Sequence, residues 1–275
     1  MMALIGELGV PERSSSLVER AHADLLADAL DLPSPGRRLP ALWHWAFFPP
    51  RAATAALGED GHPARPAGEL AGLTRRMWVG GRVWFPGDLD VDTRTERRSA
   101  LGAVVPKQGR QGPFVLVTLR HELVQAGARR VVEEQDLVFR PPAEAGAGTT
   151  PTNPPNQPES PAPTRSVVRP ISPVLLFRYA ALTFNAHRIH YDLDYATGVE
   201  GYPGLVIQGP LLATLLAGLA TVDGGTLARF EYRSHAPAVA PSTLTLSLAE
   251  TGDGPALLAT RPDGVVSMSA TATRR

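Results

Sequence analysis

The segment "PLLATLLAGLATV", which begins at Pro210, constrains the fold more than any other part of this sequence. It is apolar almost all round, and a helix with that pattern has to be buried on every side. Proline is well placed at the start of a helix, because the N–H that it lacks would have no helical partner there. The fold must therefore surround one central helix with apolar side chains.

The rest of the second half has the pattern of antiparallel strands. Three β-rich runs, at 242–250, 255–260 and 265–273, are separated by "TGDG" and "RPDG". Glycine in such turns supplies the positive φ that a tight reversal needs. The first half repeats this plan with runs at 93–105, 113–125 and 130–139. We therefore expect the second half to be a structural copy of the first.

A proline-rich stretch separates the halves. Between residues 141 and 165, eight of 25 residues are proline and no large apolar side chain is present. Such a segment builds no core and lacks donors for a strand ladder. The 275 residues also exceed the usual size of a single domain. We expect an N-terminal domain over 1–140, a linker over 141–166 and a C-terminal domain over 167–275.

Helical material is also expected at the start of the chain. In "SSSLVERAHADLLADAL", residues 14–30, Leu17, Ala21, Leu25 and Leu26 fall near one helical face, with the serines available as caps. Helices combined with antiparallel meanders, one helix being wholly apolar, suggest an α+β fold in which a curved sheet wraps around a central helix. That architecture is the hotdog fold, here present twice in tandem.

The composition narrows the class of protein. Basic and acidic residues balance at 27 each, so no excess charge favours a nucleic-acid or membrane surface. The lack of cysteine excludes disulfides, thiolate metal sites and a cysteine nucleophile. No targeting segment and no apolar run of about 20 residues is visible. We expect a cytoplasmic protein without nucleic-acid or membrane partners.

Polar residues crowd into "TFNAHRIHYDLDYA", residues 183–196. One interpretation is a metal site formed by His187, His190 and Asp192, although no "HExxH" or other recognised ligand spacing accompanies them. A second is a polar turn with satisfied hydrogen bonds. The third is catalysis by Asn185 and His190. We expect no metal.

The element downstream supports catalysis. "GLVI" is strand-like and leads into Gln208 and Gly209, where the buried helix begins. The backbone N–H groups at a helix N-terminus point outward unpaired, at the positive end of the dipole. Glycine lets a ligand oxygen approach this backbone closely. Such a cradle suits an oxyanion that develops at a carbonyl.

"FNAHRIHYD" followed by "GLVIQGPLLATLL" resembles the MaoC-type, or hydratase-2-type, hydratases and dehydratases, which have the hotdog fold. The family signature carries a catalytic Asp, a catalytic His five positions later and a Gly at the start of the central helix. These positions fall here on Asn185, His190 and Gly209. The departure is asparagine for aspartate.

The N-terminal half extends the resemblance through "LWHWAFFPPRAATAALGEDGHP" and "TRRMWVGGRVWF". These are similar to the first hotdog of double-hotdog proteins that act as mesaconyl-CoA or itaconyl-CoA hydratases, and of 3-hydroxyacyl-thioester dehydratases whose N-terminal dehydratase domain resembles that of fatty acid synthase. In that subgroup "FNxHxIHYD" replaces the aspartate-containing motif. The resemblance covers both halves and leaves out the linker.

The resemblance implies reversible hydration of an α,β-unsaturated acyl-CoA to a 3-hydroxyacyl-CoA, with coenzyme A in the substrate and no further cofactor. His190 has an unperturbed pKa of about 6.5 and suits proton exchange. Gly209 N–H would hold the enolate oxygen. Asn185 exchanges no proton at neutral pH, so it orients water or product. His190 then works alone or shares protons with Asp192 or Asp194, whose other expected role is to form a cap or to orient an imidazole.

Four further residues are candidate substrate ligands: His187, Arg188, Gln208 and Tyr191. Arg188 either pairs with the second carboxylate of a diacid such as mesaconate or faces solvent. A monomer and a homodimer are equally compatible with the tandem plan. Two alternative functions remain, namely a (3R)-hydroxyacyl-thioester dehydratase of fatty-acid or polyketide synthesis and a non-catalytic acyl-thioester-binding protein.

The first half shows no comparable pair of catalytic residues. His44 lies between two tryptophans, and core packing is its expected role. Trp78 and Trp84 either line an acyl or pantetheine tunnel or pack in the core. The arginines that are candidates for the coenzyme phosphates are Arg75, Arg76, Arg97, Arg98 and Arg233.

Overall fold

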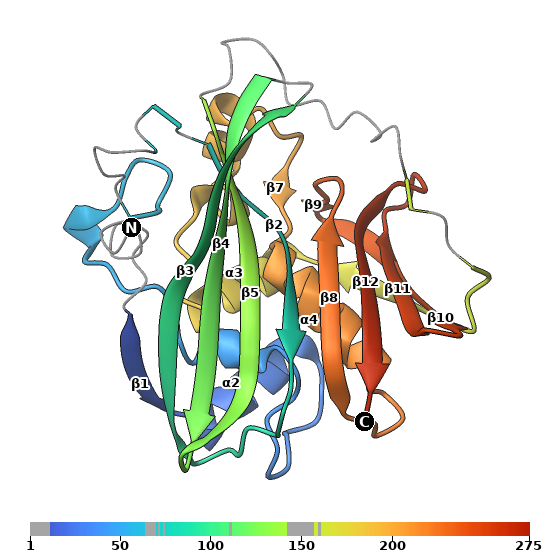
Figure 1. Cartoon of the computed structure of the whole chain (residues 1–275). Coiled ribbons are helices and arrows are strands. Elements are labelled where there is room, and N and C mark those ends of the chain that lie inside the picture. Colours follow the sequence, from blue (N-terminus) through green and yellow to red (C-terminus); the bar gives the residue numbers. More distant parts are fainter. Residues whose placement is uncertain are drawn as a thin grey trace.

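One antiparallel sheet of ten strands carries both halves of the chain (Figure 1). The computed structural model describes residues 12–63, 70, 72–73, 75–109, 112–141, 157–158 and 161–275. The strand order is β1-β3-β4-β5-β2-β8-β12-β11-β10-β6, so the first five strands belong to the first half and the last five to the second. Together with the short helices this confirms the predicted α+β class and the double hotdog.

The predicted meanders are present in both halves. The first half contributes β1 (Arg13–Leu17), β2 (Arg75–Trp84), β3 (Arg94–Gly109), β4 (Gly112–Gln125) and β5 (Ala128–Arg140). The second contributes β6 (Arg165–Ile171), β8 (Leu227–Ser234), β10 (Ser242–Thr251), β11 (Gly254–Thr260) and β12 (Val266–Arg274). A separate two-stranded ribbon pairs β7 (Leu205–Val206) with β9 (Val239–Ala240).

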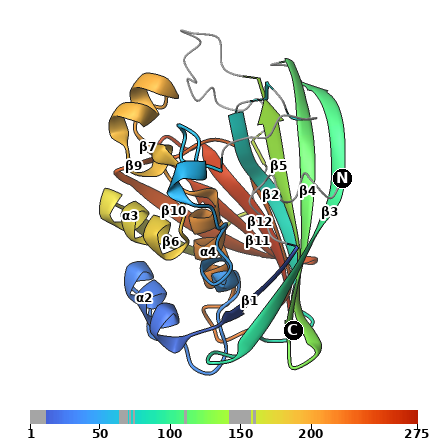
Figure 2. The ribbon, with the colours of Figure 1, turned by 90° about the vertical axis from the view of Figure 1, so that its left-hand side faces the viewer.

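The apolar segment forms α4 (Gly209–Ala220), as the sequence predicts. Eight of its residues are buried, among them Leu211, Leu212 and Leu216. In Figure 2, α4 lies between the curved sheet and two outer helices, α2 (Arg20–Leu30) and α3 (Pro173–Leu182). One apolar core contains residues of all three helices and of both halves of the sheet.

The N-terminal helix differs from its prediction. Residues 13–17 form β1, which pairs with β3, and α2 begins only at Arg20 behind Glu19, which makes no side-chain cap. The buried face of α2 includes Leu26, but Leu25 is half exposed. The serines were expected to cap a helix, and they instead extend the sheet because pairing with β3 satisfies their backbone groups.

The strands of the two halves match, but among the described residues the central helix α4 of the second half has no counterpart in the first. Between β1 and β2 the described residues form α2 and two short 3₁₀ turns, η1 (Trp43–Ala46) and η2 (Thr54–Ala56). In this part of the chain no long helix corresponds to α4. Among its described residues, the N-terminal half therefore lacks a long central helix, and we call this region the reduced centre. The second half holds the central helix α4.

The reduced centre contains a buried carboxylate. Glu133 accepts hydrogen bonds from His44 Nε2 (3.1 Å), Trp45 Nε1 (2.7 Å) and Gln135 Nε2 (2.7 Å). These donors, together with the charge of nearby imidazoles, outweigh the cost of burial and hold the Glu133 pKa at about 2. His44 is buried as expected, with a polar partner that the sequence did not reveal.

The halves meet at the seam between β2 and β8, with register from Gly80 opposite Arg233 to Trp84 opposite Arg229. A Cβ on Gly81 would lie 2.3 Å from Tyr232 Oη, so glycine is required there for Tyr232 to lie flat. The Tyr232 ring stacks on Trp78 with 4.6 Å between centroids, and Trp45 meets both rings edge-on. The seam is thus an aromatic cluster.

The predicted linker lies mostly outside the described residues, at 142–156 and 159–160, and so does the chain start at 1–11. β6 begins at Arg165, inside the range assigned to the linker. Among the described residues, no helix combines the length and apolarity that a membrane span requires.

Candidate active site

The end of α3 positions Asn185. This helix starts at Ser172, whose Oγ accepts from Leu175 N, and it ends where Phe184 takes the left-handed conformation (φ 52°). Asn185 N then donates to Ala180 O at 2.8 Å. Asn185 Oδ1 accepts from His187 N at 3.1 Å. Because the oxygen is engaged with a donor, the amide presents its NH₂ group as a donor.

His190 is a buried neutral base. It ends the 3₁₀ turn η3 (Arg188–His190), and its Nδ1 donates to Val206 O at 2.7 Å. That bond fixes the tautomer and leaves Nε2 with its lone pair. Burial lowers the pKa of His190 to about 4. The imidazole therefore accepts a proton from a bound group without being protonated in advance at neutral pH.

Hydrogen bonds link the start of α4 to the segments that carry Asn185 and His190. Gln208 stands directly before α4 without a side-chain capping bond, and its buried Nε2 donates to Leu176 O in α3 at 2.9 Å. Gly209 is the first residue of α4, and Val206, the acceptor for His190, stands three residues earlier. These bonds link α3, η3, β7 and α4 in one framework. Gln208 thus anchors two helices, and contact with substrate stays a prediction.

Trp78 covers the start of α4. A Cβ at position 209 would lie 2.6 Å from Trp78 Cε3, so glycine alone fits beneath this ring. The tryptophan comes from β2 of the first half. The cradle at Gly209 is therefore built from both halves.

Arg188 and Tyr191 are engaged within the protein. The Arg188 guanidinium binds Asp192 Oδ2 at 2.7 Å and lies 4.1 Å from the Tyr195 ring centroid. Tyr191 is half exposed, and its hydroxyl donates to Ala186 O. Asp192, considered above as a proton-sharing partner for His190, instead pairs with Arg188 and accepts from Tyr195 N.

A loop of the first half docks on the motif. Residues 57–63 form a reversal closed by the Leu57–Pro63 bridge. Arg188 N donates to Asp60 O at 2.9 Å, and Arg188 Nη1 donates to Glu59 O. A Cβ on Gly61, whose φ is +85°, would lie 1.8 Å from Ala186 O. Backbone contact this close fixes the loop against the segment between Asn185 and His187.

The docked loop brings a carboxylate and an imidazole to the site. Asp60 Oδ2 lies 3.2 Å from His62 Nδ1, and Asp60 Oδ1 accepts from His62 N. The His62 ring is 4.1 Å from that of His187, which lies edge-on to His190 with 5.4 Å between centroids. Burial and the neighbouring imidazoles hold the pKa of His187 far below its usual value. Three imidazoles therefore form a row across the boundary between the halves.

The structure brings a different set of residues to metal-ligand spacing from the set that the sequence suggested. His187, His190 and Asp192 are not assembled as ligands, since His190 and Asp192 are held by Val206 and Arg188. Among the described residues, the group with suitable spacing is Asp60, His62 and His187, whose ligand atoms lie within 4.8 Å of one another. Sequence spacing did not reveal it, because the loop is more than a hundred residues away.

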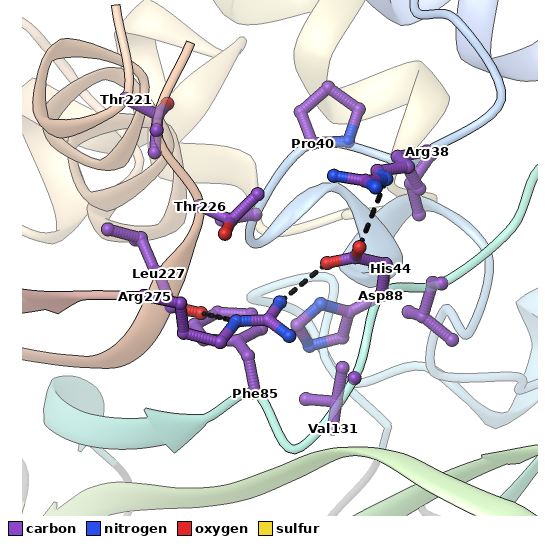
Figure 3. Close-up of a pocket in the computed structure, with 15 residues that line it drawn as sticks. Arg38, Pro40, His44, Phe85, Asp88, Val131, Thr221, Thr226, Leu227 and Arg275 are labelled. Atoms are coloured by element: carbon purple, nitrogen blue, oxygen red, sulfur yellow. Dashed lines mark hydrogen bonds and ion pairs between the residues drawn. The ribbon is translucent and has the colours of Figure 1, made fainter. Parts of the chain in front are cut away.

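A separate pocket of ≈ 170 Å³ lies at the other end of α4, beside Thr221 and Leu227 (Figure 3). His44 lines it. In Figure 3, Asp88 lies between the guanidinium groups of Arg38 and Arg275 and pairs with both. Since α4 has 12 residues, this pocket is roughly 18 Å from Gly209 along the axis. It is not the predicted site.

The arginines that are candidates for binding the coenzyme phosphates lie in different parts of the structure. Arg97 is buried and donates to Phe48 O, and Arg98 pairs with Glu96 on β3. Arg75 and Arg76 stand at the start of β2 near the motif. Arg75 bonds to Tyr202, and Arg76 is close enough to His187 to lower its pKa.

Comparison with known proteins identifies the family of the chain. Residues 42–240 match the family model described as hydroxyacyl-thioester dehydratase type 2. The chain is 40% identical over 274 residues to mesaconyl-C(4)-CoA hydratase of Chloroflexus aurantiacus, covering 98% of this chain and 96% of that protein. It is also 42% identical over 95 residues to the mitochondrial hydroxyacyl-thioester dehydratase type 2 of Schizosaccharomyces pombe, a match that spans 33% of this chain and 32% of that protein.

Solved structures support the fold. HtdX of Mycobacterium tuberculosis superposes with a TM-score of 0.70 at 19% identity, covering 95% of this chain and 99% of that one. A MaoC-like dehydratase of Phytophthora capsici gives 0.69 at 11% identity, covering 99% of each. The resemblance and the fold predicted above are thereby confirmed, and the non-catalytic alternative is set aside. The chain belongs to the hydroxyacyl-thioester dehydratase type 2 family and is a MaoC-like hydro-lyase.

Proposed function

We propose that the protein adds water to a short, dicarboxylic α,β-unsaturated acyl-CoA such as mesaconyl-CoA, giving the 3-hydroxyacyl-CoA. The likeness to mesaconyl-C(4)-CoA hydratase over 98% of the chain supports this substrate class. The observation that carries the reaction is the neutral His190, whose Nδ1 is fixed by Val206 and whose Nε2 keeps its lone pair.

Each motif residue has a distinct role in this proposal. His190 Nε2 accepts a proton from water as the oxygen attacks the β-carbon. The NH₂ group of Asn185 orients that water, since Asn185 Oδ1 is held by His187 N. Gly209 N–H and the α4 dipole stabilise the thioester oxygen as it gains charge. The reaction uses no cofactor beyond the coenzyme A of the substrate.

Arg76 is the proposed partner for the second carboxylate of a diacid. It stands on β2, two residues before Trp78, and its charge acts on His187. Arg188, which pairs with Asp192, is the second candidate for this role. Arg76→Gln should raise KM for mesaconyl-CoA far more than KM for crotonyl-CoA, which lacks that carboxylate. An equal change for both thioesters would remove Arg76 from substrate recognition.

The reaction is tested by following loss of the conjugated thioester absorbance. The panel comprises crotonyl-, mesaconyl-, itaconyl- and long-chain enoyl-CoA, with wild type, Asn185→Ala and His190→Ala. We expect His190→Ala to lose on the order of 10²-fold or more in kcat. If neither substitution lowers turnover, the proposed site is wrong.

A second candidate function is dehydration of (3R)-hydroxyacyl thioesters in fatty-acid or polyketide synthesis. The match to the fission yeast dehydratase favours it. A higher kcat/KM for long-chain substrates on an acyl carrier than for mesaconyl-CoA would select this function.

The cytoplasm is the proposed location, supported by the cysteine-free composition. The tandem plan supports a monomer or a homodimer. Light scattering of the purified chain decides between them.

A further inference from the structure

Hydration requires two proton transfers, and the motif supplies one group for them. Water loses a proton when it attacks the β-carbon, and the α-carbon gains one. His190 can serve the first transfer. Asn185 stands where related enzymes carry an aspartate, and its amide exchanges no proton near neutral pH. The second transfer needs a group from elsewhere.

The loop of residues 57–63 carries such a group. His62 Nδ1 is 3.2 Å from Asp60 Oδ2, and both side chains are about four-fifths shielded from solvent, with 21% and 19% of their surfaces exposed. The pKa of Asp60 is strongly lowered, mainly because bonding and charge from His62 outweigh burial, so this carboxylate is ionised. An ionised carboxylate at that distance stabilises the protonated imidazole and orients its ring.

The loop is held in place by the motif that it serves. Arg188 binds the carbonyls of Glu59 and Asp60, and Gly61 lies against Ala186 without room for a Cβ. The Arg188 backbone is two residues from His190. Movement of His62 relative to His190 is therefore restricted by backbone contacts on both sides.

We infer that His62, oriented by Asp60, is the second proton-exchanging residue of this active site and donates the proton that the α-carbon gains. The inference rests on the proposed hydration and deepens it. It assigns to the N-terminal half a direct part in the chemistry, with His62 as the catalytic residue and Asp60 as its positioning residue.

The water oxygen bonds to the β-carbon, and the water proton passes to His190 Nε2. The electron pair of the double bond moves toward the α-carbon and the thioester oxygen. The α-carbon takes a proton from protonated His62, leaving that imidazole neutral. Before the next turnover, His190 releases its proton to solvent and His62 takes one up from solvent, which restores both groups.

A metal ion is the competing use of the same residues, because Asp60, His62 and His187 have compatible spacing. The contact between Asp60 Oδ2 and His62 Nδ1 favours proton chemistry, since both atoms are already engaged with one another at hydrogen-bond distance. Chelator treatment in the assay separates the two uses.

The test uses the full chain with crotonyl-CoA and mesaconyl-CoA. His62→Gln should lower kcat on the order of 10²- to 10⁴-fold with little change in KM. Imidazole added to His62→Ala should restore part of the rate. Asp60→Asn should lower kcat by less, and Asp60→Glu should recover part of that loss. Both matched controls, His235→Gln and Asp263→Asn, should keep wild-type kcat; Asp263 accepts from the backbone N–H two residues on, as Asp60 does.

Several outcomes overturn the inference. A His62→Gln enzyme with wild-type kcat leaves hydration standing and removes His62 from it. Activity that is lost with a chelator and restored by Zn²⁺ would likewise leave hydration standing and remove His62 as its proton donor. A wild type inert toward every thioester overturns the proposed function, and this inference with it. If His62 substitutions unfold the chain, Asp60→Asn, which keeps the side-chain volume, decides through the split between kcat and KM.

Discussion

Gly209 meets two requirements at one position. Its N–H lies at the start of α4, where no helical acceptor exists, and its Cα packs beneath the Trp78 ring. Trp78 is itself stacked on Tyr232, so it has little freedom to retreat. A side chain at 209 would therefore disturb both the oxyanion cradle and the aromatic seam.

Gly209→Ala should consequently lower kcat sharply and destabilise the fold by about 1–3 kcal/mol, the usual cost of overpacking. Gly218→Ala is the matched control on the same helix, because a Cβ there meets nothing within 4 Å. Alanine at 218 should stabilise by up to ~1 kcal/mol through helix propensity. Melting temperature and hydratase rate measure both variants, and equal behaviour of the two would contradict this account.

The docked loop of residues 57–63 is placed against the motif by backbone contacts. It adds little apolar contact, since Leu57 and Pro63 are only half-buried. Its position depends on Gly61, which has a left-handed φ and contacts Ala186 O. One glycine thus controls whether Asp60 and His62 reach the motif.

Gly61→Ala should displace this loop, because alanine at a positive φ costs about 1–2 kcal/mol before the clash with Ala186 is counted. We expect a large loss of kcat with the melting temperature lowered only modestly. Hydrogen exchange should increase at residues 57–63 and 185–192. Gly198→Ala, where a Cβ meets nothing within 4 Å, should show none of these changes.

The strands and α4 could be predicted from the sequence because each has a local pattern. The Asn185–His190–Gly209 motif was identified by its resemblance to the family signature, and its catalytic role stays a prediction. Alternation marks a strand, and all-round apolarity marks a buried helix. β1 was missed because its serines carry no alternation, and its pairing with β3 lies about 80 residues along the chain. The helical pattern assigned to residues 14–19 was local, and a distant strand overrode it.

The docking of the loop of residues 57–63 on the candidate site could not be predicted for the same reason. Asp60 and His62 stand in "EDGHP", where a carboxylate two residues before an imidazole is a signal of chemistry. Nothing in that stretch shows that it docks more than a hundred residues away. Arg188 was assigned either to a substrate carboxylate or to solvent, because its binding to Asp192 and the loop carbonyls depends on the folded chain and cannot be predicted from the sequence.

For the whole molecule, the seam between β2 and β8 joins the halves through Tyr232. Its ring is buried among Trp45, Trp78 and Phe230, while its hydroxyl has no hydrogen-bond partner among the described residues. Burial raises the pKa of this phenol well above its usual value. The ring stabilises the seam and the hydroxyl does not.

Tyr232→Phe should therefore be neutral or slightly stabilising in urea unfolding, because it removes an unsatisfied buried group. Tyr232→Ala should cost about 3–5 kcal/mol, as large aromatic truncations do. We expect both halves to lose structure in one transition. Separate transitions, or a large cost for Tyr232→Phe, would mean that the seam is not the common support.

Acid should weaken the fold before carboxylates titrate. Burial lowers the pKa of His121 and of His190 to about 4. The unfolded chain binds these protons below about pH 6.5, whereas the folded chain does not until about pH 4. The free energy of unfolding should thus fall as pH drops across this window, by roughly 3 kcal/mol for each group.

Glu133 affects the free energy of unfolding at lower pH than the histidines do. Its depressed pKa of about 2 gives stability that is present above about pH 4.5 and lost as pH falls toward 2. Urea unfolding between pH 7.5 and 4.5 isolates the histidines, and His121→Gln should reduce the slope by about one proton. A pH-independent stability over that range would contradict the burial of these neutral imidazoles.

The reduced centre of the N-terminal half determines how many acyl-CoA molecules one chain can bind. A pair of complete hotdogs would offer two equivalent helix N-termini, one on each side of the pseudo-symmetry. Here η1 replaces one of them and α4 is the other, while the loop of the reduced half turns to the site of its neighbour. Titration calorimetry with a saturated acyl-CoA should accordingly saturate at one thioester for each chain, not two.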